Sequence, residues 1–237
     1  MKKVAIVTGG SRGIGYSIAQ NLCNENYFVY IIGKKDRSEK ELASFGLKKF
    51  CYLSSDVASY SSLKEILTKI IRKHNRVDVL VNSAGITEDK KMNFMTEKSW
   101  NDVIKTNLNG TFWTIKIVSK QMIKQRSGVV VNISSATTKK AALGQSNYMS
   151  SKAGVEALTR AAALELARYN IRVNSVSPGY IDTEMTDRID KGKLIDIIPL
   201  RRFGKPKDVA ELVSFLISKK SSYITGQNFV VDGGLTL

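Results

Sequence analysis

The alternation of short apolar runs with longer amphipathic segments is the feature that most restricts the fold of this chain. Short runs rich in β-branched residues lie at 4–8, 28–32, 50–53, 77–82, 128–134, 171–177 and 228–232. Segments with apolar residues near i, i+3, i+4 and i+7 lie at 14–25, 61–73, 97–125, 148–169 and 207–218. Strand, helix, strand in succession implies right-handed crossovers and a mainly parallel sheet covered on both faces. The pattern predicts a doubly wound α/β fold of about seven strands.

The chain of 237 residues shows no repeat and no linker that would divide it. We therefore expect a single domain over residues 1–237. One irregular insertion, residues 178–206, holds all three prolines and follows a predicted strand. Long loops at the carboxyl ends of strands usually carry function, so this segment is predicted to be a substrate lid.

Composition sets limits on location and partners. A hydrophobic share of 43% with 24% charged residues is ordinary for a packed globular protein. The first apolar run is too short for a signal peptide, and other runs are too short for a membrane span, so we expect a cytoplasmic protein. Cys23 and Cys51 have no metal-site or CxxC spacing, which favours free thiols and no bound metal.

The net charge of +16 comes from 37 Lys and Arg against 21 Asp and Glu. Such a charge favours encounters with anionic partners, although a Lys-rich bias of the source explains it equally well. The basic residues are scattered as pairs rather than gathered into a stripe with interleaved aromatics. We therefore expect no nucleic-acid partner.

A glycine-rich loop, "TGGSRGIG" at residues 8–15, joins the first predicted strand to the first predicted helix. Its spacing, Gly9, Gly13 and Gly15, differs from GxGxxG. Glycines still permit positive φ and close approach of a diphosphate, and the helix start offers free N–H groups. The alternative is a structural turn, but the flanking strand and helix favour a dinucleotide site.

The choice between NAD and NADP depends on charge near the end of the second strand. Gly33 ends that strand and two lysines follow, beginning with Lys34, while Arg12 of the glycine loop can point to the same region. These cations favour a 2′-phosphate and predict NADPH. Asp36 is interpreted as an exposed partner of Arg37.

Tyr148 and Lys152 in "YMSSK" lie one helical turn apart on the same face of a predicted helix. A phenol titrates near ~10, and a neighbouring ammonium is expected to lower that pKa and let the pair exchange a proton near neutral pH. Ser135, thirteen residues earlier at the end of a strand, is within reach of the phenol. Read alone, the stretch could be only a polar helix start.

Seven motifs occur together in one order and carry a family resemblance. They are "TGGSRGIG", "DV" at 56–57, "NSAG" at 82–85, Asn107, "ISS" at 133–135, "YMSSK" at 148–152 and "PG" at 178–179. The chain resembles the short-chain dehydrogenase/reductase family over essentially its whole length, which implies a Rossmann-type sheet and a nicotinamide-dependent oxidoreductase. Ser83 departs from the asparagine that the family usually has there.

The resemblance implies a role for each matching residue. Ser135 would polarise the substrate carbonyl beside Tyr148, and Ser134 would be structural. Asn107 would support a water that links Lys152 to solvent, or could be a polar helix residue bonded to backbone. Asp56 would contact the adenine amino group, and Ile181 and Thr183 the carboxamide. The complete predicted cofactor set is Gly9, Ser11, Arg12, Gly13, Ile14, Gly15, Lys34, Asp56, Val57, Asn82, Ala84, Gly85, Tyr148, Lys152, Pro178, Gly179, Ile181 and Thr183.

Within the family the chain is most similar to 3-oxoacyl-acyl-carrier-protein reductases and acetoacetyl-CoA reductases. "KTNLNGTF" at 105–112, "GQSNY" at 144–148, "SPGYIDTEM" at 177–185 and "IPLRRFGKPKDVAELVSFL" at 198–216 carry this similarity. It implies NADPH-dependent reduction of a 3-oxoacyl thioester in fatty acid biosynthesis, by a homotetramer. Arg126 and Arg168 match basic positions that dock the acyl carrier protein, whereas Glu88 departs from a basic one.

Other functions remain open from the sequence. The substrate could be a CoA thioester, a polyketide or another ketone, and the acyl chain length is not defined. A non-catalytic dinucleotide-binding regulator is a remote alternative, because it would have no need for Ser135, Tyr148 and Lys152 in register.

Overall fold

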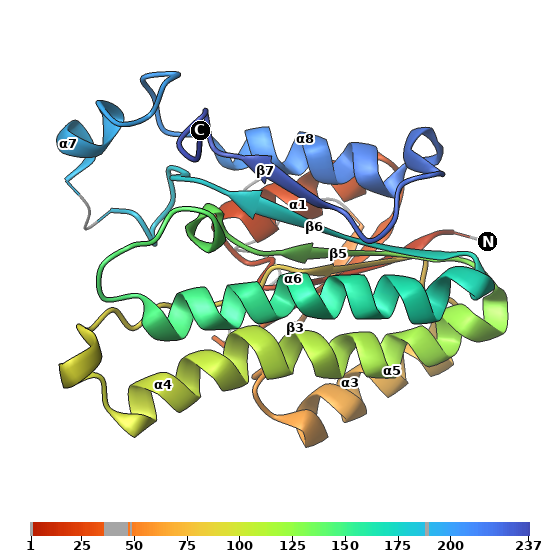
Figure 1. Cartoon of the computed structure of the whole chain (residues 1–237). Helices are drawn as coiled ribbons and strands as arrows, with labels where there is room; N and C mark the ends of the chain where they lie inside the picture. Colours follow the sequence, from red (N-terminus) through yellow and green to blue (C-terminus); the bar gives the residue numbers. More distant parts are fainter. Residues whose placement is uncertain (1, 36–46, 48, 188–189) are drawn as a thin grey trace.

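All seven predicted strands form one parallel sheet in the computed structural model, which describes residues 2–35, 47, 49–187 and 190–237 (Figure 1). The strand order is β3-β2-β1-β4-β5-β6-β7. The strands are β1 (Val4–Thr8), β2 (Phe28–Gly33), β3 (Phe50–Ser54), β4 (Val79–Asn82), β5 (Gly128–Ile133), β6 (Ile171–Pro178) and β7 (Asn228–Val231). The predicted doubly wound α/β fold is confirmed.

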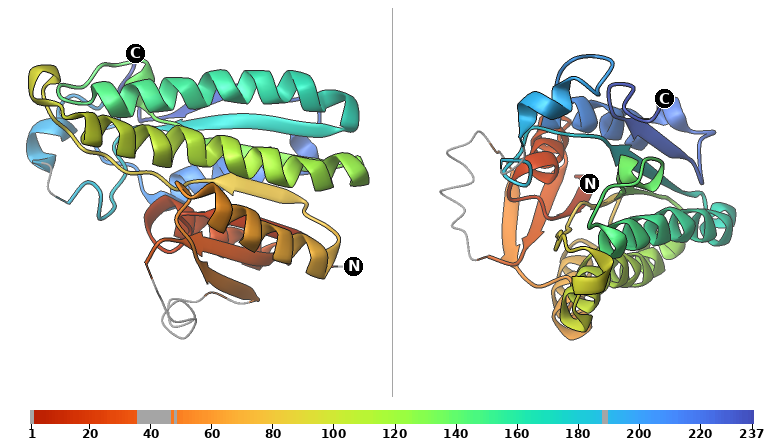
Figure 2. Two further views of the ribbon diagram at one scale, coloured as in Figure 1. Left: turned by 90° about the horizontal axis from the view of Figure 1, so that it is seen from below. Right: turned by 60° about the vertical axis from the view of Figure 1, so that its left-hand side comes forward.

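Helices cover both faces of the sheet (Figures 1 and 2). One face carries α1 (Gly13–Asn24) and α8 (Pro206–Ile217), and the other carries α3 (Tyr60–His74), α5 (Gly110–Gln125) and α6 (Ser146–Leu166). The shorter elements are α4 (Glu97–Ile104), α7 (Lys191–Ile195), η1 (Met92–Phe94), η2 (Lys105–Asn109), η3 (Ala136–Thr138), η4 (Ala167–Tyr169) and η5 (Lys219–Ser221). Within the described ranges, no helix is both long and apolar enough to cross a membrane.

The alternation of side chains along β1 explains why its first four residues are all apolar. Ala5 and Val7 belong to the core under α1 and α8, whereas Val4 and Ile6 belong to the core under α3, α5 and α6. All five residues of the strand are buried. A central parallel strand with helices on both sides needs apolar residues on both of its faces.

Two elements differ from the prediction. The strand expected at 77–82 begins only at Val79, because the side chain of Gln125 takes both backbone hydrogen bonds of Val77. The helix expected over 97–125 is interrupted by the π-helical turn η2, which joins α4 to α5 and carries Asn107. Such turns inside helices often mark functional sites.

The carboxyl ends of the strands all reach one edge of the sheet. Strand order reverses at β1, whose neighbours are β2 and β4, and this topology opens a crevice at that edge. The segment 178–206, predicted to be a lid, leaves the same edge after β6, contains α7 and returns into α8 (Figure 1). Residues 188–189 within it lie outside the described residues.

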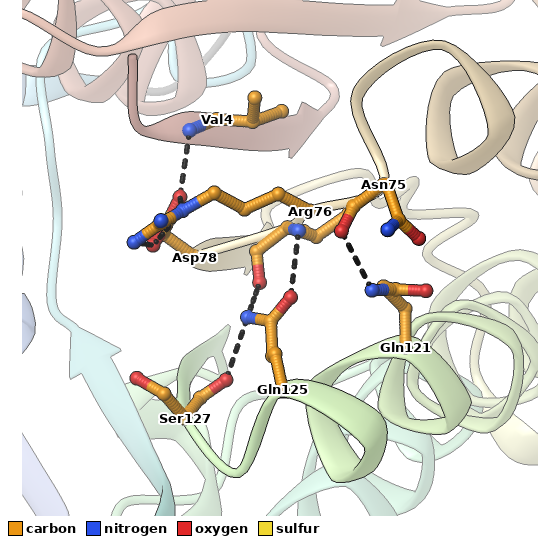
Figure 3. A network of polar contacts seen from close by, with 8 residues as sticks. Val4, Asn75, Arg76, Asp78, Gln121, Gln125 and Ser127 are labelled. Carbon is orange, nitrogen blue, oxygen red and sulfur yellow. Dashed lines mark hydrogen bonds and ion pairs between the residues drawn. The ribbon is translucent and has the colours of Figure 1, made fainter. Parts of the chain in front are cut away.

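At the opposite edge, side chains join the strand starts to two helix ends (Figure 3). The carboxylate of Asp78 accepts hydrogen bonds from the backbone N–H of Val4 at 2.8 Å and from Arg76 Nε at 2.8 Å. Gln125 Nε2 donates to the carbonyls of Val77 at 2.6 Å and Ser127 at 2.7 Å. This network therefore fixes where β1, β4 and β5 begin.

We predict that Asp78→Ala lowers the free energy of unfolding by about 2 kcal/mol, because it leaves a buried N–H and a half-buried guanidinium without their acceptor. Urea unfolding of both proteins measures the difference. Glu65→Ala, which breaks an exposed ion pair with Lys69, is the control and should leave the unfolding midpoint unchanged. Equal effects of the two variants would contradict this role of Asp78.

Candidate active site

A cavity of about 440 Å³ opens at the carboxyl edge of the sheet. Seventeen of the eighteen residues predicted to bind the cofactor line it; only Asn82 does not. Ser135 lines it as well, so catalytic and cofactor-binding predictions meet in one space. The volume and the mainly apolar walls are typical of a small-molecule site.

In the wall of this cavity, the backbone of the glycine loop packs closely against the backbone of the loop after β4. Gly9 has a φ of +67°, and a Cβ there would lie 2.7 Å from the backbone N of Ala84. Gly13, at a φ of +52°, opens helix α1. A side chain at either position would occupy the cradle that a diphosphate needs, so the loop fits a dinucleotide.

Two ion pairs lie at the adenosine end predicted for the cofactor. Lys34 Nζ lies 2.7 Å from Asp56 Oδ2, and Arg12 Nη1 lies 2.7 Å from Glu184 Oε2 of the predicted lid. Burial raises the pKa of Asp56, but hydrogen bonds from Lys34 and the Ala58 N–H outweigh it and bring this pKa below its usual value. Asp36, interpreted as an exposed partner of Arg37, lies outside the described residues.

Asn82 lies behind the cavity wall, in a buried polar chain. Thr114 Oγ1 donates to Asn82 Oδ1 at 2.7 Å, and Asn82 Nδ2 donates to Asn132 Oδ1 at 2.9 Å. Asn132 Nδ2 continues to Thr159 Oγ1 at 2.9 Å. The chain ties α5, β4, β5 and α6 together, which gives Asn82 a part in holding the wall rather than facing the cavity.

Tyr148, Lys152 and Ser135 come together in the wall of the cavity. Lys152 is 4% exposed; its Nζ lies 5.6 Å from the centre of the Tyr148 ring and donates to the Ile133 carbonyl at 2.8 Å. The hydroxyl oxygen of Ser135 accepts from the Thr137 N–H at 3.2 Å, and Ser135 hydrogen-bonds the phenol. The three side chains therefore line one cavity, and their part in proton transfer stays a prediction.

The direction of the Tyr148 pKa differs from the prediction. Burial raises this pKa, and the hydrogen bond with Ser135 only partly offsets the effect. Burial also lowers the pKa of Lys152 to about 8. The predicted net lowering of the phenol pKa is wrong for this structure, because removal of water around Tyr148 raises that pKa more than the neighbouring groups lower it.

Asn107 is buried in the π-helical turn, and its side chain is fully engaged. Oδ1 accepts from the Ile86 N–H at 2.9 Å, while Nδ2 donates to the Ile86 carbonyl at 3.0 Å and to Ser151 Oγ at 3.0 Å. A Cβ on Gly85 would lie 3.4 Å from Asn107 Oδ1 and 3.5 Å from Lys152 Nζ. Asn107 thus lies near Lys152. Its side-chain hydrogen bonds join the loop after β4 to helix α6.

Arg126 and Arg168 are brought together, but far from the cavity. Arg126 Nη2 donates to the Arg168 carbonyl at 3.3 Å, and the Arg168 guanidinium stacks 4.8 Å from the centre of the Tyr169 ring. Arg168 follows Tyr148 by twenty residues along α6 and η4, so about 30 Å separates them at 1.5 Å per residue.

Several residues of the cavity wall are not among the predicted site residues, although some of them lie inside the quoted motifs. They are Ile32, Gly33, Lys35, Ser55, Ser83, Ile86, Thr106, Ile133, Ser134, Glu184, Met185 and Thr186. Most of them are next in sequence to a predicted site residue, and Glu184 to Thr186 lie in the predicted lid. Their position near the ends of predicted strands is the sequence feature that could have identified them. Among the described residues, no cluster of His, Cys, Asp and Glu could hold a metal ion.

Comparisons with known proteins agree with this geometry. A family model described as Enoyl-(Acyl carrier protein) reductase matches residues 9–236. The chain is 44% identical over 243 residues to the 3-oxoacyl-[acyl-carrier-protein] reductase FabG of Staphylococcus epidermidis, with 99% of each chain covered. It is 42% identical over 242 residues to the protein of that name from Thermotoga maritima, with 99% and 98% covered. A solved structure described as gox2181 matches with a TM-score of 0.93 at 33% identity, covering 99% of this chain and 96% of that one.

The chain belongs to the short-chain dehydrogenase/reductase family, as its motifs predicted. Within it, the two relatives named above are reductases of 3-oxoacyl groups carried by acyl carrier protein. It is an oxidoreductase that works with a nicotinamide dinucleotide.

We predict that kcat/KM falls as pH rises through about 8, because Lys152 loses the proton that makes it an ammonium. The folded pKa lies below the unfolded value, so the contribution of this group to stability rises with pH between about 8 and 10.5, and its titration does not unfold the protein over the decline. Initial rates and thermal midpoints across pH 6–10 separate the two effects. In Lys152→Arg, residual activity should lack the decline, since guanidinium stays charged; an identical profile would contradict the assignment.

Proposed function

We propose that this protein reduces a 3-oxoacyl thioester, carried by acyl carrier protein, to the 3-hydroxyacyl thioester with NADPH, as a step of fatty acid biosynthesis. The observation that carries the proposal is that Ser135, Tyr148 and Lys152 line the same cavity as the glycine loop. Full-length relatives named as 3-oxoacyl-[acyl-carrier-protein] reductases support the substrate class. The sequence argument also favours the cytoplasm as its location.

The reaction follows from what each residue can do. NADPH, when bound, supplies the hydride. Ser135 donates a hydrogen bond to the carbonyl oxygen and polarises it, and Tyr148 donates its proton to the same oxygen as charge develops there. Lys152 stabilises the phenolate that this transfer leaves behind. Asn107, beside the lysine, supports a water that returns a proton from solvent.

Two cations support NADPH rather than NADH. Lys34 is paired with Asp56 and Arg12 with Glu184, so each basic side chain already lies next to an anion at the adenosine end. A 2′-phosphate carries more charge than either carboxylate and would compete for both cations. Asp56 would then be free to accept from the adenine amino group.

We expect Lys34→Ala to raise KM for NADPH about tenfold, which corresponds to ~1.4 kcal/mol for one charge contact, and to leave KM for NADH unchanged. Steady-state rates with each cofactor measure this. Lys69→Ala, an exposed lysine on α3, is the matched control and should change neither constant. A wild-type protein that prefers NADH would overturn the cofactor assignment.

The carrier-docking proposal for Arg126 and Arg168 requires more than one copy. These arginines lie about 30 Å along α6 from Tyr148, too far to guide an acyl chain into the same copy's cavity. A homotetramer could place them beside a neighbour's cavity. Exposed apolar side chains support such packing: Leu164 of α6 is 84% exposed and Phe112 of α5 is 40% exposed.

NADPH oxidation with acetoacetyl-acyl carrier protein and with acetoacetyl-CoA, at low and high salt, tests the substrate. We expect turnover of the carrier-bound substrate to fall with salt, because a chain of net charge +16 would steer an acidic carrier. Tyr148→Phe should abolish turnover while NADPH binding is kept. Indifference to both thioesters would remove the proposal.

A second candidate is reduction of an enoyl thioester, which the description of the family model suggests. Crotonyl-acyl carrier protein in the same assay distinguishes the two, and other ketones test the polyketide alternative. Cofactor binding with no turnover of any of these substrates would favour the non-catalytic regulator.

A further inference from the structure

Glu156 is a buried acidic residue that the proposed reaction does not use. It lies on α6 and is 7% exposed. Four donors approach its Oε1: Ser134 Oγ at 3.0 Å, Thr138 Oγ1 at 2.7 Å, Ser177 Oγ at 3.0 Å and Asn228 Nδ2 at 3.1 Å. They come from the loop after β5, the end of β6 and the start of β7. One oxygen therefore joins three separate segments to the helix.

The carboxylate competes with other acceptors for all three of the hydroxyls among these donors. Ser134 Oγ also lies 3.1 Å from the Lys152 carbonyl, and Ser177 Oγ lies 2.9 Å from Asn228 Oδ1. Each hydroxyl has a single proton to donate. Hydrogen bonds to an ionised oxygen are roughly twice as strong as neutral ones, so the carboxylate is the favoured acceptor.

The segments held by Glu156 carry the reacting parts of the cavity. Ser134 precedes Ser135, and Thr138 Oγ1 also lies 2.9 Å from the Ser135 carbonyl. Ser177 precedes Pro178, which lines the cavity wall. Glu156 itself is one turn after Lys152, on the same face of α6.

We propose that Glu156 is a positioning residue that sets the distance from the Ser135 loop and the Pro178 wall to the catalytic helix. This inference rests on the proposed function, because one of its tests measures kcat of the proposed reduction. It predicts that the carboxylate contributes to turnover through Ser135, which must lie within hydrogen-bond distance of the substrate oxygen. Small misplacements of such groups can cost up to ~10²-fold in rate.

Glu156→Gln and Thr138→Val test this proposal. An amide oxygen carries less charge than a carboxylate, and Thr138→Val removes one donor from the Ser135 loop. We expect Glu156→Gln to lower kcat about tenfold and Thr138→Val to lower it less, with KM and the NADPH dissociation constant within about twofold of wild type.

Asn174→Ala is the matched control for stability. Asn174 is fully buried on β6, accepts from the Gln227 N–H at 3.0 Å and donates to the Ile224 carbonyl at 3.0 Å, and its hydrogen bonds do not involve the Ser135 loop. The variant Asn174→Ala should lower the thermal midpoint as much as Glu156→Gln does, and its kcat should stay within about twofold of the wild-type value. If Asn174→Ala loses as much kcat, or Glu156→Gln loses none, the proposal is overturned.

A readout without substrate keeps this inference separate from the proposed function. The Thr138 N–H donates to the Ser135 carbonyl at 3.2 Å, so its hydrogen exchange reports the order of the loop. Exchange over residues 135–139 should be faster in Glu156→Gln than in wild type, and unchanged in Asn174→Ala. Unchanged exchange in Glu156→Gln would overturn the positioning role even in an active enzyme. If Glu156→Gln does not fold, Thr138→Val provides both measurements.

Discussion

The single direction of all seven strands is the constraint on which the site depends. Because the strands are parallel, their carboxyl ends meet at one edge, and the pairing register places Thr8, Asn82 and Asn132 side by side there. The glycine loop follows the first of these strand ends, and the Ser135 loop follows the third. Residues more than a hundred positions apart in the sequence therefore share one cavity without any long reach of their side chains.

Keeping a lysine in this cavity has an energetic cost. The lowering of its pKa from 10.5 to about 8 corresponds to ~3 kcal/mol against the protonated Lys152, by the usual conversion. The hydrogen bond to the Ile133 carbonyl offsets part of that cost. The sheet provides the remainder, because its two apolar cores stabilise the fold on either side of this polar edge. The site therefore lowers the stability of the fold locally, and the apolar cores on either side compensate for this loss.

Periodicity predicted nearly every strand and helix, because a buried parallel sheet leaves a strong apolar signal. Spacing predicted the glycine cradle and the Tyr148–Lys152 pair, since both depend on residues close in sequence. Contacts between distant residues could not be predicted in this way. Arg12 meets Glu184 across 172 positions, and Asn82 turns into a buried chain rather than the cavity. Only the packed fold determines which of several polar neighbours a side chain contacts.

The raised pKa of Tyr148 keeps the phenol protonated, which is the form that the proposed reduction requires. Oxidation of an alcohol requires a phenolate to accept its proton, and burial disfavours that anion. In reduction, the arriving hydride turns the carbonyl oxygen toward an alkoxide, which is a stronger base than a phenolate even when the phenol pKa is raised. In the proposed reaction, proton transfer from Tyr148 to that oxygen is then downhill, and Lys152 would stabilise the charge that remains. Burial therefore holds Tyr148 in the protonated form in which the proposed reduction begins, while the equilibrium between ketone and alcohol is set by the reactants and the pH.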